Sequence, residues 1–136
     1  MTLADAGPLI ALIDAGEPDH DRCRLALERL PLPLLTTWPV FTEAIYLLGR
    51  AAGWPGQDAL WRMVERRALV LADIEDALVA RSADLMRRYN DHPMDLADAT
   101  LVALAEARDL REIFTLDSDF RTYQLRGKRH LSVIPD

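Results

Sequence analysis

The chain lacks several features that would assign it to a particular class of protein. It has one cysteine, Cys23, among 136 residues, so no internal disulfide can form and nothing indicates an oxidising compartment. No apolar run approaches the ~18 residues that span a membrane. The opening stretch, MTLADAGPLIALIDAG, has no basic leader, and acidic residues interrupt its apolar run. These absences predict a cytoplasmic protein that does not enter a membrane.

Positive charge is also scarce. Lys and Arg number 16 against 22 Asp and Glu, which gives a formal net charge of −6 and by itself argues against a nucleic-acid partner. The basic residues nevertheless cluster, and the C-terminal segment carries four of them with no acid before Asp136: Arg121, Arg126, Lys128 and Arg129. A solvated surface is the simplest account of each cluster.

Hydrophobic residues make up half of the chain, which at this length supports a single domain over residues 1–136 with a sizeable core. Short apolar runs that predict strands alternate with helix-length segments. We expect strands at residues 2–4, 30–37, 68–71, 112–115 and 131–135. Strands separated by helices indicate an α/β fold with a parallel, doubly wound sheet.

Several acidic residues lie where carboxylates are poorly tolerated unless a positive charge meets them. Asp5 follows the first strand and Asp117 follows the strand EIFT, so both fall at the sheet edge where parallel sheets bind ligands. Glu43 and Asp98 have largely apolar neighbours on their helices. A solvated turn or helix capping, with Asp95 as the N-cap and Asp98 in the first turn, could explain each acid alone.

Capping is a weaker account of the acids taken together. Acids gathered in one crevice repel one another and raise each other's pKa, and a divalent cation removes that repulsion. Oxygen ligands with no His or Cys nearby favour Mg²⁺ or Mn²⁺ over zinc. A pocket of this kind suits phosphoryl chemistry, because the metal polarises a phosphate and lowers the pKa of bound water.

The ordered acids resemble those of PIN-domain ribonucleases, and most closely those of the small VapC-type toxins of prokaryotic toxin–antitoxin pairs. The matching segments are LADAGPLIAL, TTWPVFTEAIYLL, DATLVALA in the form D-A-x-x-x-A-x-A, and FTLDSDF in the form T-x-D-x-x-F. Their order and spacing agree with the family over essentially the whole chain. The resemblance implies a PIN-like three-layer fold, with a mostly parallel central sheet flanked by helices.

The resemblance also implies an activity, which is metal-dependent endoribonuclease cleavage by the toxin of a type II toxin–antitoxin system. The acidic quartet that binds Mg²⁺ or Mn²⁺ would be Asp5, Glu43, Asp98 and Asp117. Asp119 would be an additional acid, and Asp95 would support the site or cap its helix. Expected partners are a second copy of the chain, an antitoxin whose C-terminal segment enters the acidic groove, and structured RNA such as transfer RNA.

The hypothesis gives each group a role. Asp5, Asp98 and Asp117 bind one or two metal ions directly, and Glu43 binds directly or through water. The C-terminal basic residues 121–129 steer the RNA backbone. The family often has Ser or Thr two residues after the first Asp, and this chain has Gly7 there.

Two alternatives remain open. One is a non-catalytic PIN-like module for binding or regulation, which Gly7 and the negative net charge leave possible. The other is a different Mg²⁺-dependent phosphohydrolase. A haloacid-dehalogenase-like phosphatase needs a second Asp two residues after the first, where this chain has Gly7. A receiver domain needs paired acids at the first strand and a Lys after the last, and neither is evident.

Overall fold

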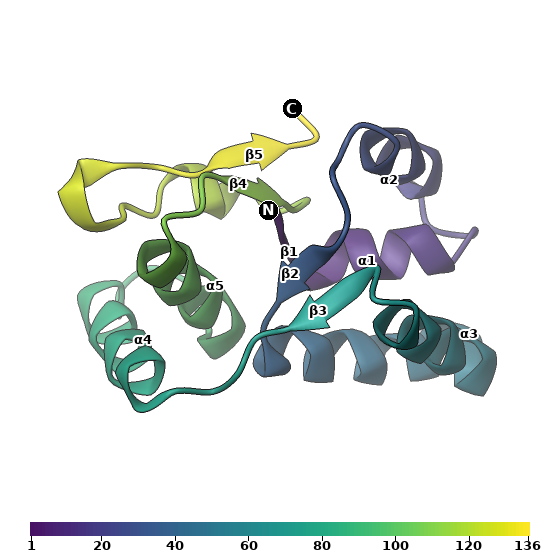
Figure 1. Cartoon of the computed structure of the whole chain (residues 1–136), viewed down its shortest axis with the longest axis horizontal. Coiled ribbons are helices and arrows are strands. Elements are labelled where there is room, and N and C mark those ends of the chain that lie inside the picture. The colour runs from purple at the N-terminus through teal and green to yellow at the C-terminus, as the bar shows by residue number, and fades with distance from the viewer.

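The structure, a computed structural model, describes all residues from 1 to 136 as a five-stranded sheet with helices on both sides (Figure 1). The strands are β1 (Leu3–Ala4), β2 (Leu34–Thr36), β3 (Leu69–Leu71), β4 (Glu112–Phe114) and β5 (Ser132–Ile134). Every pairing is parallel, and the strand order is β3-β2-β1-β4-β5. The predicted α/β fold with helices flanking a parallel central sheet is confirmed.

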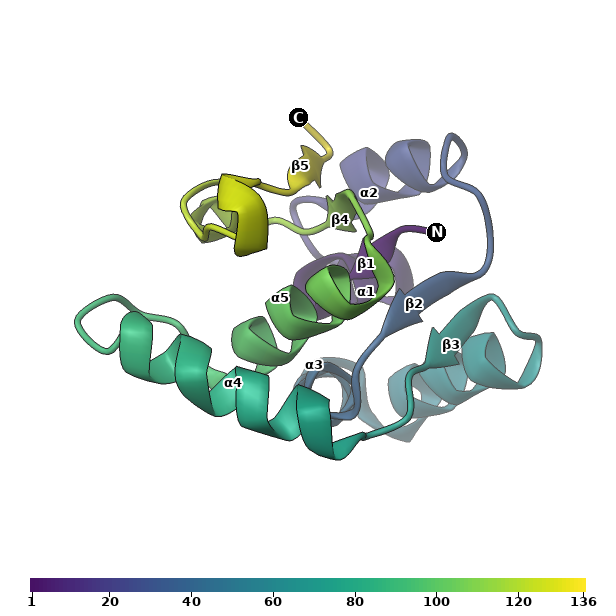
Figure 2. The same cartoon turned by 60° about the vertical axis from the view of Figure 1, so that its left-hand side comes forward.

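The helices form two groups on opposite sides of the sheet (Figures 1 and 2). One group comprises α1 (Ala6–Ile13), α2 (His20–Leu27) and α3 (Trp38–Glu65), and the other comprises α4 (Asp76–Arg88) and α5 (Leu96–Arg108). Two short 3₁₀ helices follow β4: η1 (Ser118–Arg121) and η2 (Arg126–Lys128). None of the helices is both long enough and apolar enough to cross a membrane.

The apolar composition of helix α5 follows from its buried position. It lies between the sheet and α4 (Figure 2), and its residues 97–105 are all buried. A helix covered on all sides needs apolar residues around its whole circumference, and the alanines at positions 97, 99, 103 and 105 let its neighbours approach closely. These residues belong to one continuous core of 32 buried hydrophobic side chains.

Helix α3 consists of two helical parts joined by a kink. Within Trp38–Glu65 the backbone leaves the helical conformation at Gly53, which has φ 66° and ψ −160° and lies in GWPGQ, a segment whose residues are typical of a turn. Glycine reaches a positive φ without the steric cost that a side chain imposes. Pro55 then falls in the first turn after the kink, where its missing N–H is tolerated. The turn residues therefore divide α3 into two helical parts, as their composition indicates.

The strand order sets the position of the predicted acids. The chain runs outward from β1 to β2 and β3, and then crosses to the other side of β1 to form β4. The direction of winding therefore reverses between β1 and β4, and open α/β sheets bind ligands at the carboxyl ends of such strands. Asp5 directly follows β1, and its N–H donates to the carbonyl of Phe114 in β4 at 2.9 Å. Asp117 follows β4 at the same edge.

Candidate functional site

An open cavity of about 300 Å³ at this edge of the sheet collects the predicted acids. We call it the acid pocket, and its lining residues are Asp5, Ala6, Gly7, Glu43, Asp95, Asp98, Leu116 and Asp117. Five of these eight residues carry carboxylates, and none carries a positive charge. The structure therefore brings the predicted quartet together with Asp95, whereas Asp119 does not line the pocket.

Asp5 is held on both of its carboxylate oxygens. Oδ1 accepts a hydrogen bond from the N–H of Ala6 at 2.8 Å, and Oδ2 accepts one from the hydroxyl of Thr115 at 2.7 Å. The Thr115 hydroxyl oxygen also accepts from the N–H of Asp117 at 3.0 Å. One hydroxyl thus ties the carboxylate after β1 to the loop after β4. The role of Thr115 is not apparent from the sequence alone, although its place at the end of an apolar strand is a signal that points to this edge of the sheet.

Asp98 has two structural roles at once. It forms a capping box with Asp95, in which Asp95 Oδ1 accepts from the Asp98 N–H at 2.8 Å and Asp98 Oδ2 accepts from the Asp95 N–H at 3.4 Å. The hydroxyl of Tyr123 also donates to Asp98 Oδ2 at 3.3 Å. Capping therefore occurs, but it does not explain why a carboxylate only 6% exposed stands in this helix. Both contacts use Oδ2, which leaves Oδ1 for a ligand.

The exposure of Glu43 differs from what its apolar neighbours predict. Its helix face is apolar, but it is not buried: Glu43 is exposed, and its neighbour Tyr46 is 60% exposed. This face of α3 forms the wall of an open groove that shares Glu43 and Asp95 with the acid pocket. Glu43 therefore stands at the junction between two cavities.

The remaining predicted residues lie away from the acid pocket. The N–H of Asp119 donates to Asp117 Oδ1 at 2.9 Å, which helps to hold Asp117. Arg121 pairs with Asp136 at 3.1 Å. The other basic residues of the C-terminal segment (126–129) lie in and around η2, and Arg126 and Arg129 line a polar cavity together with the C-terminal end of α5. That end is ten residues, or ~15 Å, along the helix from Asp98.

The electrostatics of the pocket are dominated by carboxylates without a counter-charge. Burial, and then repulsion from Asp95 and Asp5, raise the pKa of Asp98 from 3.8 to about 7. Burial also raises the pKa of Asp5, against the lowering effect of its hydrogen bonds to Thr115 and Ala6. The pKa of Glu43 is raised as well, because its carboxylate, although exposed, loses part of its hydration at the pocket wall and faces the charges of Asp95 and Asp5. The site is therefore short of positive charge.

The donor set fits a hard divalent cation. All of its side-chain donors are carboxylate oxygens, which suit Mg²⁺ or Mn²⁺. As placed, no three of these side chains converge closely enough to hold one ion directly. Mg²⁺ commonly keeps several of its waters and binds through only one or two carboxylates. The pocket therefore suits an ion that is held partly through water.

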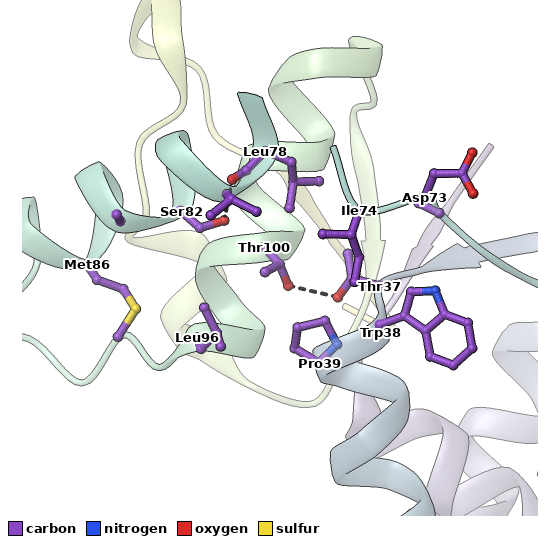
Figure 3. Close-up of a pocket in the computed structure, with 13 residues that line it drawn as sticks. Thr37, Trp38, Pro39, Asp73, Ile74, Leu78, Ser82, Met86, Leu96 and Thr100 are labelled. Carbon is purple, nitrogen blue, oxygen red and sulfur yellow. Dashed lines mark hydrogen bonds between the residues drawn. The ribbon is translucent and has the colours of Figure 1, made fainter. Parts of the chain in front are cut away.

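A separate apolar cavity of about 360 Å³ lies between the start of α3, the loop before α4, and helices α4 and α5 (Figure 3). The hydroxyls of Thr37 and Thr100 form a 2.8 Å hydrogen bond within it. Ile74, Leu96 and Trp38 stand around it and remain 61%, 51% and 40% exposed. An exposed apolar surface of this kind commonly marks a contact with another protein.

Known proteins share both the sequence pattern and the fold. The PIN domain family matches residues 2–124. Ribonuclease VapC26 of Mycobacterium tuberculosis is 30% identical over 134 residues, which is 98% of this chain and 99% of the relative. The crystal structure of M. tuberculosis VapC20, a sarcin-ricin loop cleaving toxin, matches with a TM-score of 0.83 at 19% identity, over 90% of this chain and 94% of that one. A toxin–antitoxin complex from Klebsiella pneumoniae matches with a TM-score of 0.68 at 21% identity, over 88% and 90%.

The chain belongs to the PIN-domain family, and the predicted resemblance to its VapC-type members is confirmed.

Proposed function

We propose that this chain is a single-domain, metal-dependent endoribonuclease, the toxin of a type II toxin–antitoxin system that hydrolyses RNA phosphodiester bonds in the cytoplasm. The observation that carries the proposal is the acid pocket, with five carboxylates and no basic side chain at the point where the sheet reverses its winding. The relationship to Ribonuclease VapC26 over nearly the whole chain supports the choice of RNA as substrate.

In this proposal Asp5, Asp98 and Asp117 hold Mg²⁺ or Mn²⁺, and Glu43 joins them directly or through water. When bound, the ion supplies Lewis-acid activation of water and neutralises charge on the leaving oxygen. A pocket carboxylate would take the proton of the water that attacks phosphorus, the P–O3′ bond would break, and the departing 3′-oxygen would be protonated. The products would therefore carry 5′-phosphate and 3′-hydroxyl ends.

Other residues of the chain position these ligands. Thr115 fixes the carboxylate of Asp5 and the backbone of Asp117 through one hydroxyl. The N–H of Asp95 and the hydroxyl of Tyr123 hold Asp98 Oδ2, so that Oδ1 remains for the ion. The ligand carboxylates are therefore oriented before the ion binds, which reduces the ordering that binding requires.

An antitoxin is the proposed regulator. A pocket with five carboxylates and no counter-charge is complementary to a protein segment that carries Arg or Lys. The structural match to the Klebsiella toxin–antitoxin complex supports a fold that is compatible with such a partner. The proposed target is a structured RNA such as transfer RNA.

We also propose a homodimer through α4. Ile74, Val79 and Met86 expose apolar side chains along this side of the molecule. Helix α4 follows acids at 73 and 75, begins with Asp76, and ends with Arg at 87 and 88. If two copies pack with antiparallel α4 helices about a two-fold axis, each acidic start meets a basic end and the apolar side chains are covered. Sedimentation of Val79→Glu should then show a monomer, whereas an unchanged dimer would place the interface elsewhere.

The deciding experiment is cleavage of a mixed transfer-RNA and ribosomal-RNA pool by antitoxin-free protein. It is run with Mg²⁺, with Mn²⁺ and with EDTA, beside Asp98→Asn and the control Asp119→Asn, whose acid lies outside the pocket. We expect discrete fragments with 5′-phosphate ends that require metal, disappear with Asp98→Asn and persist with Asp119→Asn. Fragments ending in 2′,3′-cyclic phosphate would refute attack by water. If no RNA is cut and metal ions do not raise the melting temperature, the non-catalytic module is the better account.

A further inference from the structure

The groove beside the acid pocket has features that the proposed mechanism does not use. It has a volume of about 730 Å³, is open to solvent, and is walled on one side by α3. Glu43 and Asp95 line both this groove and the acid pocket, so the two cavities are continuous. A polymer whose phosphate lay among the carboxylates could therefore extend into this groove.

A stripe of side chains runs along α3 beside that junction. Trp38, Thr42, Tyr46 and Arg50 recur at intervals of four residues, so each is the neighbour of the next in a stripe that winds gradually around the helix. Thr42 and Tyr46 line the groove. Tyr46 follows Glu43 by three residues, close to one helical turn or ~5 Å along the axis. The ring of Tyr46 is thus within a nucleotide's length of the carboxylates.

Tyr46 and Arg50 form a pair on this face. The Arg50 guanidinium donates from Nη1 to the Tyr46 hydroxyl at 3.3 Å, and its Cζ lies 5.9 Å from the centre of the ring. The ring remains 60% exposed. Arg50 takes part in none of the ion pairs of the structure. Its charge is therefore available to an anion, while its hydrogen bond helps to hold the ring.

An exposed aromatic ring next to an uncommitted guanidinium is the combination that binds unpaired RNA, because a base stacks on the ring and the cation meets a phosphate. We propose that Tyr46 and Arg50 form a nucleotide subsite that takes one unstacked base next to the scissile phosphate. This inference rests on the proposed endoribonuclease function and adds to it a place where a protein of net negative charge holds its substrate.

Although Trp38, Ile74 and Leu96 also line the groove, the polar pair of Tyr46 and Arg50 favours RNA over a second copy of the chain at this wall. The α4 surface proposed for dimerisation presents apolar side chains such as Val79 and Met86, whereas Tyr46 and Arg50 present a hydroxyl and a guanidinium. Thr42, one turn before Tyr46, adds a further hydroxyl at the wall of the groove. The two lining residues shared with the acid pocket also place this subsite on a path that an RNA strand can follow.

The test is RNA binding, measured in a chain that cannot cleave. Short single-stranded RNA with a fluorescent 5′ end is titrated in Mg²⁺ with Asp98→Asn protein, alone and combined with Tyr46→Ala, Tyr46→Phe or Arg50→Ala. The matched control is Trp54→Ala, an aromatic residue 63% exposed on the same helix beyond the Gly53 kink, which lines neither the groove nor the acid pocket.

We expect Tyr46→Ala to raise the Kd by about tenfold, since a stacked base is lost, and Tyr46→Phe to remain near the parent because the ring is kept. Arg50→Ala should raise the Kd and lower the slope of log Kd against log salt by about one, as the loss of a single phosphate contact predicts. Trp54→Ala should leave both quantities unchanged.

Two results would overturn the subsite. One is equal affinity for Tyr46→Ala and Trp54→Ala. The other is dissociation of a homodimer by Tyr46→Ala, seen by sedimentation, which would assign this face to a second copy. Failure of the proposed function is a different outcome, because the parent chain would then cut no RNA with metal whatever the binding of the Tyr46 variants.

Discussion

Replacing Asp98 by Asn should stabilise the metal-free protein. Asn is nearly isosteric, and its side-chain oxygen can still accept from the Asp95 N–H and the Tyr123 hydroxyl, so the change removes mainly a charge. A pKa raised from 3.8 to about 7 corresponds to about 4 kcal/mol of unfavourable ionisation at pH 8. Water reaches the open pocket and screens part of this repulsion, so we expect a gain of about 2 kcal/mol.

The assay is thermal and urea unfolding in EDTA at pH 8, where Asp98→Asn should raise the melting temperature by about 5–8 °C for a chain of this length. The advantage should shrink as the pH falls. Between pH 4 and 7 the folded state retains a proton on Asp98 that the unfolded state releases, so the stability of the parent falls as the pH rises through this range. Near pH 4 the two proteins should unfold almost together. Added Mg²⁺ should stabilise the parent more than the variant.

A matched control separates charge repulsion from helix capping. Asp76→Asn changes an exposed acid in the first turn of α4, where a negative charge favours the helix, and it should lose a few tenths of a kcal/mol. If Asp98→Asn also loses stability in EDTA at pH 8, then the capping box and the Tyr123 contact outweigh the repulsion. The carboxylate would then be explained by capping, and the argument for a metal from electrostatics would fail.

Three further substitutions probe the supports of the site. Thr115→Val removes the hydroxyl that holds Asp5, so it should lower the free energy of unfolding by about 1–2 kcal/mol and weaken Mn²⁺ binding measured by calorimetry. An unchanged Mn²⁺ affinity would show that the hydroxyl does not position the carboxylate. Gly7→Ser should fit, because a Cβ there would stand 3.5 Å from the nearest atom, in the Leu116 side chain. It should raise the free energy of unfolding, measured in a urea titration, by about 0.5 kcal/mol through better helix propensity. A decrease would mean that the space beside Gly7 is too small for a side chain. Glu106→Gln removes the 2.7 Å ion pair with Arg81, in which the Glu106 side chain is only 7% exposed. It should lower the free energy of unfolding by about 2–3 kcal/mol in the same titration, while RNA cleavage persists. A loss of cleavage by folded protein would link this distant pair to the site.

Local patterns sufficed for the architecture and for the positions of the acids on it. Asp5 and Asp117 each follow a short apolar run, and a parallel sheet places all such points at one edge. The kink in α3 also agrees with its local pattern. GWPGQ has the residues of a turn, and the backbone is non-helical at Gly53, while Leu60 and Met63 beyond the kink pack into the same core as Leu48 before it.

The details of the site depended on contacts that no local pattern encodes. Tyr123 reaches Asp98 across 25 residues, and Thr115 reaches Asp5 across 110. The environment of Glu43 could not be inferred either, because an apolar helix face reads the same whether the fold covers it or leaves it open. For the same reason, basic residues adjacent in sequence gave no indication that residues 126–129 would lie near the far end of α5.

The contact between β1 and β4 has a consequence for the synthesis of this protein. A ribosome makes the strand before Asp5 among the first residues of the chain, but the strand that must pair beside it comes more than a hundred residues later. Until then the nascent chain carries isolated acids in place of the assembled pocket, so the metal site that we propose cannot form. If the protein is the toxin we propose, it cannot cleave RNA at this site while it is being synthesised. The acid pocket becomes active and available to an antitoxin at the same stage, once β4 has paired with β1.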